Sequence, residues 1–322
     1  MVQEKKTEMG VRMKAKWIIL FVVAVLAIIL LGIFLMSNLE KQKLNDAARK
    51  QIGGSYVRLS KGVTHYALEG PENGPVVVLV HGGTIPMFTW DELSSALMAA
   101  GFRVLRYDMF GRGFSDRPKV EYNRALYLDQ LVELLDTLQI HAPVDLVGYS
   151  FGGAIAVNFT AHYPDRVRKV ALISPVVYNY PTPAVLRLPV IGKFLGRVIG
   201  VRKIVDRADA SYRSTKFAQH HAALFAEQIS YEGFLDSFLS MMRSDALGDY
   251  RDSYTAVGKQ NRGVLLIWGT RDSEITKEAI TTAQALIPQV EFHAVDGAGH
   301  GIVFQNPEQV QSLLIGLLQS KQ

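Results

Sequence analysis

The chain of 322 residues contains no cysteine. This absence excludes disulfides, metal sites built on thiolates and a cysteine nucleophile. It says nothing about compartment, because a chain without cysteine fits an oxidising or a reducing environment. The length suits one large domain, or one domain carrying an insertion, with a substantial buried core.

The chain also has little net charge outside its N-terminus. Residues 1–52 hold nine Lys/Arg and four Asp/Glu, which leaves 26 residues of each sign in 53–322. The formal net charge of +5 therefore belongs to the N-terminal segment. A nucleic-acid partner requires a basic surface that neutralises phosphates, and this balance predicts no such partner.

One long apolar run is present, from Trp17 to Met36, with 20 uncharged residues. As a helix it is long enough to cross about 30 Å of hydrocarbon. A cleaved signal peptide is the alternative, but its apolar core is usually about 7–15 residues and ends at a small-residue site. The stretch Gly32–Ser37 offers no such site, so we expect an uncleaved membrane helix over 17–36.

The flanks of this run are charged. We expect a basic N-terminal tail over 1–16 and a charged, helical stalk over 37–54 that ends at Gly53-Gly54. The short basic N-terminus favours that end in the cytoplasm and the remaining domain on the extracytoplasmic side, although basic residues also follow the run.

Beyond residue 55, strand and helix patterns alternate. A hairpin over 56–59 and 63–68 comes first, and Val76–Val80 has the continuous aliphatic pattern of a strand buried on both faces. The further expected strands are 103–107, 144–148, 167–174, 264–268 and 290–295, and the expected helices are 89–100, 124–138, 151–162, 277–286 and 307–318. This order predicts a mostly parallel sheet with helices on both faces, formed by 55–175 and 263–322.

The interval 176–262 breaks this alternation. It is rich in proline at its start, then in aromatic residues and methionine, and shows no buried-strand pattern. An insertion at the carboxyl ends of parallel strands would lie over a site as a cap. Phe234, Phe238 and Met241 are candidates for lining a substrate pocket, and the alternative is packing between cap helices, which we expect for at least half of the cap's aromatic and methionine side chains.

Gly148, Ser150 and Gly152 form a G-x-S-x-G pattern between the expected strand 144–148 and helix 151–162. Such a turn holds the serine in a strained conformation with its hydroxyl exposed, at a helix N-terminus that favours negative charge. The pentapeptide alone also fits an ordinary glycine-rich turn. The strand before it, the helix after it and later acid and histidine residues favour a nucleophile at Ser150.

The partners of a serine nucleophile are a base and an acid that orients the base. His300 lies in a glycine-rich loop after the last expected strand, and Asp272 follows strand 264–268. Their order after Ser150 is that of nucleophile, acid and histidine. Asp296 is an alternative acid, but it lies at the end of the strand that leads to His300, whereas the order of a triad places the acid on a separate loop. We expect no metal site and no cofactor, and adjacent histidines at 220 and 221 point apart on a helix.

An oxyanion formed at Ser150 needs two donors. One is expected from the N–H of Phe151, the residue after the nucleophile, and the other from the loop after strand 76–80. We expect Gly83 to supply it, with Thr84 as the alternative. His81 in the same loop is expected to brace it.

Together these segments resemble the α/β-hydrolase fold superfamily from about residue 55 onward. The resemblance rests on His81-Gly82-Gly83, the stretch from Tyr107 to Asp116, the Ser150 turn, Trp268–Asp272 and Gly299-His300. It implies an eight-stranded sheet, a mobile cap after the sixth strand and a triad of Ser150, Asp272 and His300. It also implies structural roles for Asp108 and Ser115.

Serine at position 150 argues against the dehalogenases and epoxide hydrolases of that superfamily, which carry aspartate there. The anchor and apolar cap resemble membrane-bound esterases and monoacylglycerol lipases, which implies a hydrophobic or lipid-like carboxylic ester as substrate. Carbon–carbon bond hydrolases, peptidases and acyltransferases share the site and remain alternatives, as does a non-catalytic binding protein. A complete triad favours an enzyme.

Overall fold

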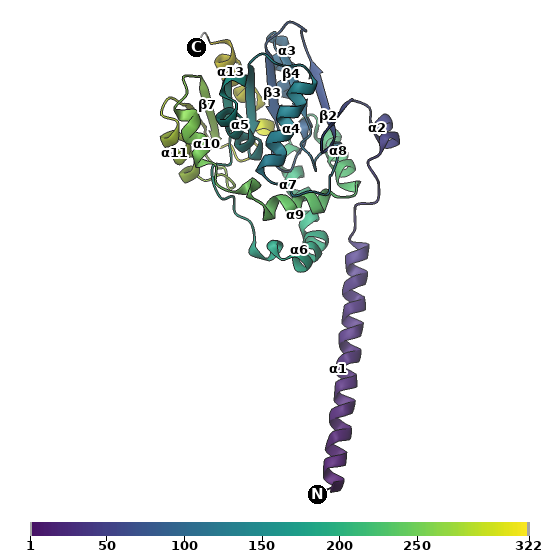
Figure 1. The fold of residues 1–322 in the computed structure, drawn as a ribbon. Helices are drawn as coiled ribbons and strands as arrows, with labels where there is room; N and C mark the ends of the chain where they lie inside the picture. The colour runs from purple at the N-terminus through teal and green to yellow at the C-terminus, as the bar shows by residue number, and fades with distance from the viewer. Residues whose placement is uncertain (1, 321–322) are drawn as a thin grey trace.

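The computed structural model describes residues 2–320, with side chains from residue 13 onward. Its centre is one eight-stranded sheet in the order β1-β2-β4-β3-β5-β6-β7-β8 (Figure 1). β1 pairs antiparallel with β2 and β2 antiparallel with β4, whereas all later pairs are parallel. The strands are β1 (Ser55–Leu59), β2 (Gly62–Glu69), β3 (Val76–Val80), β4 (Arg103–Tyr107), β5 (Val144–Tyr149), β6 (Val167–Ile173), β7 (Val264–Gly269) and β8 (Glu291–Val295). The predicted fold class is confirmed.

The sheet is buried on both faces, as its aliphatic strands predict. Val78 and Val80 of β3 belong to one apolar core, and Val77 and Leu79 to the other, because successive side chains of a strand point to opposite faces. The first core lies under α4 (Arg124–Thr137), α5 (Phe151–His162), α10 (Arg251–Gly258) and α11 (Lys277–Leu286). The second lies under α3 (Asp91–Ala99), α12 (Ile302–Gln305) and α13 (Pro307–Gln319).

The interval between β6 and β7 is helical. It contains η3 (Ala184–Arg187), α6 (Pro189–Leu195), the π-helical η4 (Gly196–Gly200), α7 (Val201–Tyr212), α8 (Ala218–Ser230), α9 (Phe234–Arg243) and η5 (Asp245–Leu247) before α10. α6, α7 and α9 lie beyond the ends of the strands, on the side from which the first helix extends (Figure 1). α10 differs, since Ser253 donates to the Asn158 side chain of α5 at 3.1 Å. The range 176–262 as a separate cap stays a prediction, and its last helix packs on the core.

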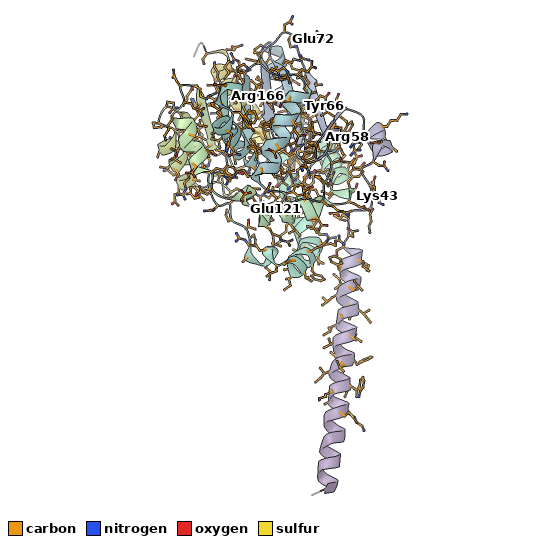
Figure 2. The ribbon with its side chains drawn as sticks, viewed as in Figure 1. Lys43, Arg58, Tyr66, Glu72, Glu121 and Arg166 are labelled. Atoms are coloured by element: carbon orange, nitrogen blue, oxygen red, sulfur yellow. The ribbon has the colours of Figure 1, made fainter. Side chains whose placement is uncertain are left out.

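The first helix, α1 (Val2–Met36), contains the predicted membrane segment. Met13–Met36 is long and apolar enough to cross a bilayer, and none of that stretch is buried in the protein. Figure 2 shows its side chains standing clear of the body over most of its length. A membrane anchor and a signal sequence share these properties. Residues 2–16 of the predicted basic tail form the start of α1, while residue 1 and the side chains of residues 2–12 lie outside the described part of the chain.

The prediction of a helical stalk over 37–54 is wrong for its first half. Only α2 (Asp46–Ile52) is helical, capped by Asn45, whose side chain accepts from the Ala48 N–H at 3.0 Å. Residues 40–42 instead contact the junction between α8 and α9, where Gln42 forms a parallel bridge with Tyr231. Backbone hydrogen bonds to the cap replace the intrahelical ones, so tertiary contacts override helix propensity here.

Candidate active site

Ser150 lies at the sharp turn between β5 and α5. Its backbone has φ 56° and ψ −121°, outside the usual regions for a residue with a side chain. The flanking glycines allow this turn to pack closely. A Cβ on Gly148 would lie 2.3 Å from the Gly152 carbonyl oxygen, and a Cβ on Gly152 would lie 2.1 Å from that of Val80. Glycine is therefore required at positions 148 and 152 for the turn that brings Ser150 to the sheet edge.

The structure brings the three predicted catalytic side chains together. His300 Nε2 lies 3.0 Å from Ser150 Oγ, and His300 Nδ1 lies 2.9 Å from Asp272 Oδ2. Asp272 is held in turn, because its Oδ1 accepts from the N–H groups of Glu274 at 2.8 Å and Ile275 at 2.9 Å. A carboxylate on Nδ1 favours the tautomer with its proton there, which leaves Nε2 free to accept the serine proton.

The alternative acid is placed elsewhere. Asp296 Oδ1 accepts from Thr270 Oγ1 at 3.0 Å, and no contact joins Asp296 to His300 among the described side chains. Tyr149, the last residue of β5, holds the backbone of His300, since its hydroxyl donates to the His300 carbonyl at 2.6 Å. The two rings lie 5.3 Å apart.

The two predicted oxyanion donors line one cavity that also contains Ser150 and His300, and they are neighbours, because a Cβ on Gly83 would lie 3.5 Å from the Phe151 Cβ. Phe151 is the first residue of α5, and Gly83 follows β3. Within residues 2–320, neither N–H has a hydrogen-bond acceptor. The buried guanidinium of Arg112 donates to the Gly83 carbonyl and fixes this residue. Thr84 also lines the cavity, so the assignment of the second donor to Gly83 stays a prediction.

The oxyanion loop is braced from below by two buried side chains. His81 Nδ1 donates to the Gly82 carbonyl at 2.7 Å, and His81 Nε2 accepts from the Met109 N–H at 2.9 Å. Asp108 accepts from the N–H groups of Met87 and Phe114 and pairs with His65 at 2.7 Å. Burial opposes ionisation of Asp108, but the hydrogen bond and charge of His65 prevail and lower its pKa. Both residues hold loops and do not face Ser150.

The burial of His81 in this loop predicts that the stability of the protein depends on pH. Burial lowers the pKa of His81 to about 4, against the nearby charge of Asp108, which raises it. Between pH 6.5 and 4 the unfolded chain binds a proton at His81 that the folded chain does not, so stability falls as pH falls through this window. The loss reaches about 3 kcal/mol by pH 4. Denaturant unfolding of the full chain in detergent at several pH values should show this slope, and His81→Gln should flatten it. An unchanged slope in the variant would contradict the assignment.

The cavity above Ser150 has a volume of about 520 Å³ and is lined mainly by apolar side chains. Two of the three predicted lining residues, Phe238 and Met241, are among them. Phe234 is not, and its prediction as a lining residue is wrong. Its fully buried ring stacks on Phe238 with 6.2 Å between ring centres and lies beside the stalk at Glu40. Phe234 packs the start of α9 against residues 37–40, a contact that no sequence pattern predicts.

Sequence reasoning missed a polar cluster in this cavity. Glu274 Oε2 lies 3.2 Å from His300 Nε2 and accepts from the Tyr180 hydroxyl at 3.2 Å. Arg207 of α7 pairs with Glu274 and donates to Tyr180 at 2.9 Å. A carboxylate beside Nε2 stabilises the imidazolium that forms when His300 takes a proton, and Arg207 offsets part of that charge. Glu274 could have been predicted at the site, because it is two residues from Asp272. Nothing in the sequence predicts that Arg207 lies beside Glu274.

No group of three or more metal-ligating side chains occurs in the part of the chain that the structure describes. The arrangement therefore consists of a serine hydroxyl with an adjacent base, an acid behind the base, two free N–H groups and an apolar cavity. Such a site can transfer an acyl group to serine and then to water.

Comparisons with known proteins support the fold. A model of the alpha/beta hydrolase fold family matches residues 75–307. A 2-hydroxymuconate semialdehyde hydrolase from Pseudomonas putida is 27% identical over 220 residues, covering 67% of this chain and 76% of that protein. Among solved structures, an enol-lactonase from Burkholderia xenovorans LB400 superimposes with a TM-score of 0.70 at 22% identity, over 83% of this chain and 100% of its own. A thermophilic esterase from Thermogutta terrifontis superimposes with 0.69 at 22% identity, over 83% and 98%.

Proposed function

The chain belongs to the α/β-hydrolase fold family, and on this premise we propose that it is a membrane-anchored serine hydrolase that cleaves hydrophobic carboxylic esters. The observation that carries the proposal is the hydrogen-bonded series from Ser150 through His300 to Asp272 at one end of an apolar cavity. A non-catalytic binding protein would have no need of all three groups in reacting geometry.

The proposed reaction begins with attack of Ser150 Oγ on the ester carbonyl carbon while His300 Nε2 takes the hydroxyl proton. The N–H groups of Phe151 and Gly83 hold the resulting oxyanion, and Asp272 stabilises the imidazolium. Collapse breaks the bond to the alcohol oxygen, which receives the proton from His300. Water then attacks the acyl-serine with His300 again as the base, and the carboxylic acid leaves as Ser150 regains its proton.

A lipid-like ester, such as a monoacylglycerol, is the favoured substrate class. Apolar side chains from the cap, including Phe238 and Met241, line the cavity beside the nucleophile. α1 is long enough to hold this cavity near a bilayer. Each buried methylene of an acyl chain contributes about 0.8 kcal/mol to binding, so a long chain gains most from such a pocket.

A second candidate is hydrolysis of a carbon–carbon bond. Relatives of this chain include a 2-hydroxy-6-oxo-2,4-heptadienoate hydrolase of Pseudomonas putida, 27% identical over 238 residues. The substrate in that name, a heptadienoate, carries a carboxylate group. Lys203 and Arg207 line the cavity of this chain and offer positive charge to such a group. Arg207 is already paired with Glu274, which is why the ester is the favoured substrate.

A substrate profile of the purified full chain in detergent separates these readings. We expect kcat/KM for a long-chain ester or monoacylglycerol to exceed that for a two-carbon ester by roughly tenfold or more, because added methylenes are buried. A 2-hydroxy-6-oxo-dienoate and a long-chain amide should be poorer substrates. Preference for the dienoate would select the second candidate. Folded protein that turns over none of these compounds would favour a binding protein, and recovery of acylated acceptor instead of free acid would show acyl transfer.

A further inference from the structure

Exposed apolar side chains gather on one part of the cap. Outside α1 and the stalk, six large apolar side chains are exposed among the described residues, and five of them lie in segment 184–200. We define these five as the cap-tip surface: Val185, Leu188, Val190, Ile191 and Ile199. Val190 is 82% exposed. Soluble proteins rarely leave such a cluster uncovered, so the surface is expected to have a partner.

The cap-tip surface lies beside the end of α1. The rings of Phe34 and Phe194 stack with 6.0 Å between centres and 12° between planes, and the Arg197 guanidinium lies 4.2 Å above the Phe34 ring. Phe34 is two residues before the end of the apolar run, about 3 Å along the helix axis. If α1 spans a bilayer, α6 and η4 must lie at the depth where the hydrocarbon ends.

The stalk fixes this placement. The Glu40 carboxylate accepts from the N–H groups of Gly233 at 3.0 Å and Leu235 at 2.6 Å, at the start of α9. The Lys41 and Gln42 N–H groups donate to the Ser230 carbonyl at 2.7 and 2.9 Å. Four residues after α1 ends, the chain is therefore hydrogen-bonded to the cap, which leaves the cap little freedom to turn away from the anchor.

The charge around the cap-tip surface identifies its partner. Segment 184–205 carries five basic residues and no acidic one, namely Arg187, Lys193, Arg197, Arg202 and Lys203. Lys193 pairs with Asp236 of α9, and the other four basic residues carry the excess positive charge. An apolar surface rimmed by Lys and Arg is typical of elements that lie in the interface of an anionic membrane. We propose that the cap-tip surface inserts into the anionic phospholipid leaflet beside α1. This inference rests on the proposed function, because it takes α1 as a membrane anchor.

The proposal gives the substrate a route. Leu186, Gly196 and Gly200, from the same segment, line the cavity that contains Ser150. One side of the segment thus faces the acyl pocket while the other faces the leaflet. A lipid ester enters the cavity from the bilayer without passing through bulk water, which favours substrates that are themselves dissolved in the membrane.

The absence of cysteine permits a direct test, since a single introduced cysteine carries the only label. The full chain with Val190→Cys, labelled with an environment-sensitive fluorophore, is reconstituted in vesicles of phosphatidylcholine and phosphatidylglycerol. We expect blue-shifted emission that spin-labelled lipids quench. The control is Glu72→Cys, which Figure 2 places at the end of the molecule opposite α1, and its emission should match that in water. Emission at 190 equal to that at 72 would overturn the proposal.

Activity supplies a second readout. Val190→Asp should lower hydrolysis of a long-chain ester presented in the same vesicles by about tenfold, through lost apolar burial and repulsion from anionic lipid. Hydrolysis of a water-soluble short-chain ester should be unchanged. Ala99→Asp, at an exposed position of α3 on the far side (Figure 1), is the matched control and should change neither rate. Equal vesicle activity in the two variants would count against the cap-tip surface.

The membrane anchor and the cap-tip surface can be tested separately. Flotation of the vesicles, after an alkaline wash, reports whether the chain is held by α1. A chain that floats but shows a water-exposed label at 190 contradicts only the cap-tip inference. A chain that does not float contradicts the anchor, and the cap-tip inference with it. If neither the two variants nor the unmodified chain hydrolyses the short-chain ester, the proposed hydrolase activity is contradicted instead.

Discussion

Replacing Ser150 by alanine is expected to lower kcat for a carboxylic ester by about 10⁵–10⁶-fold. The hydroxyl is the group that bonds to the acyl carbon, and its proton is the one that His300 Nε2, at 3.0 Å, is placed to take. The oxyanion donors and the cavity survive the change, so a small residual rate above that in water should remain. Steady-state rates of the purified variant against the same ester give the measurement.

Ser174→Ala is a matched control for this variant. Ser174 directly follows β6, the neighbour of β5, and it is fully buried and also has a positive φ, of 42°. Its hydroxyl has no hydrogen-bond partner among the described residues. We expect this variant to keep its activity within about threefold, because the removed hydroxyl makes no hydrogen bond that the change would break. Similar losses in the two variants, or a Ser150→Ala protein that retains a tenth of its activity, would contradict the assignment of the nucleophile.

Asp272→Asn is expected to lower kcat by about 10⁴-fold, the loss known for the equivalent change in a serine protease triad. The carboxylate accepts the Nδ1 proton of His300 at 2.9 Å. An amide can present its NH₂ group to Nδ1 instead, which places the imidazole proton on Nε2, where it can no longer accept the proton of Ser150. The side chain is isosteric, so unfolding by denaturant should change far less than kcat.

Asp296→Asn tests the alternative acid in the same assay. Its carboxylate bonds only Thr270 in the described structure, at the end of the histidine's own strand. We expect its kcat within about threefold of the unmodified chain, as for a substitution outside the reacting groups. A loss at position 296 equal to that at 272 would show that the acid had been assigned to the wrong strand.

The core of the fold was predictable because its sequence patterns are local. Continuous aliphatic runs such as Val76–Val80 give strands buried on both faces, and the alternating order of elements then fixes a parallel sheet. The same order brings the loops after β5, β7 and β8 to one edge. The sequence alone therefore predicts that Ser150, Asp272 and His300 lie together, since each follows a strand at its carboxyl end.

What the sequence did not reveal depends on contacts between distant segments. Residues 37–45 were expected to be helical, but the backbone of Lys41 and Gln42 bonds instead to Ser230 and Glu232, at the end of α8 and just after it. Phe234 is an aromatic residue of the kind that often lines a pocket, yet it lies against the stalk. The pairing of Arg207 with Glu274 joins a cap helix to the loop of the acid. No periodicity or local motif encodes such pairings, because they arise from how the cap docks on the core.

The most direct test of the central claim is the site of covalent reaction with a fluorophosphonate. The folded full chain is treated with the probe, and the mass of the protein and of its peptides is measured. We expect one adduct, on the peptide that contains Ser150, with no adduct in Ser150→Ala and slow formation in Asp272→Asn. A folded chain that remains unlabelled, or that carries the adduct on another residue, would contradict the claim that Ser150, His300 and Asp272 act as one catalytic unit.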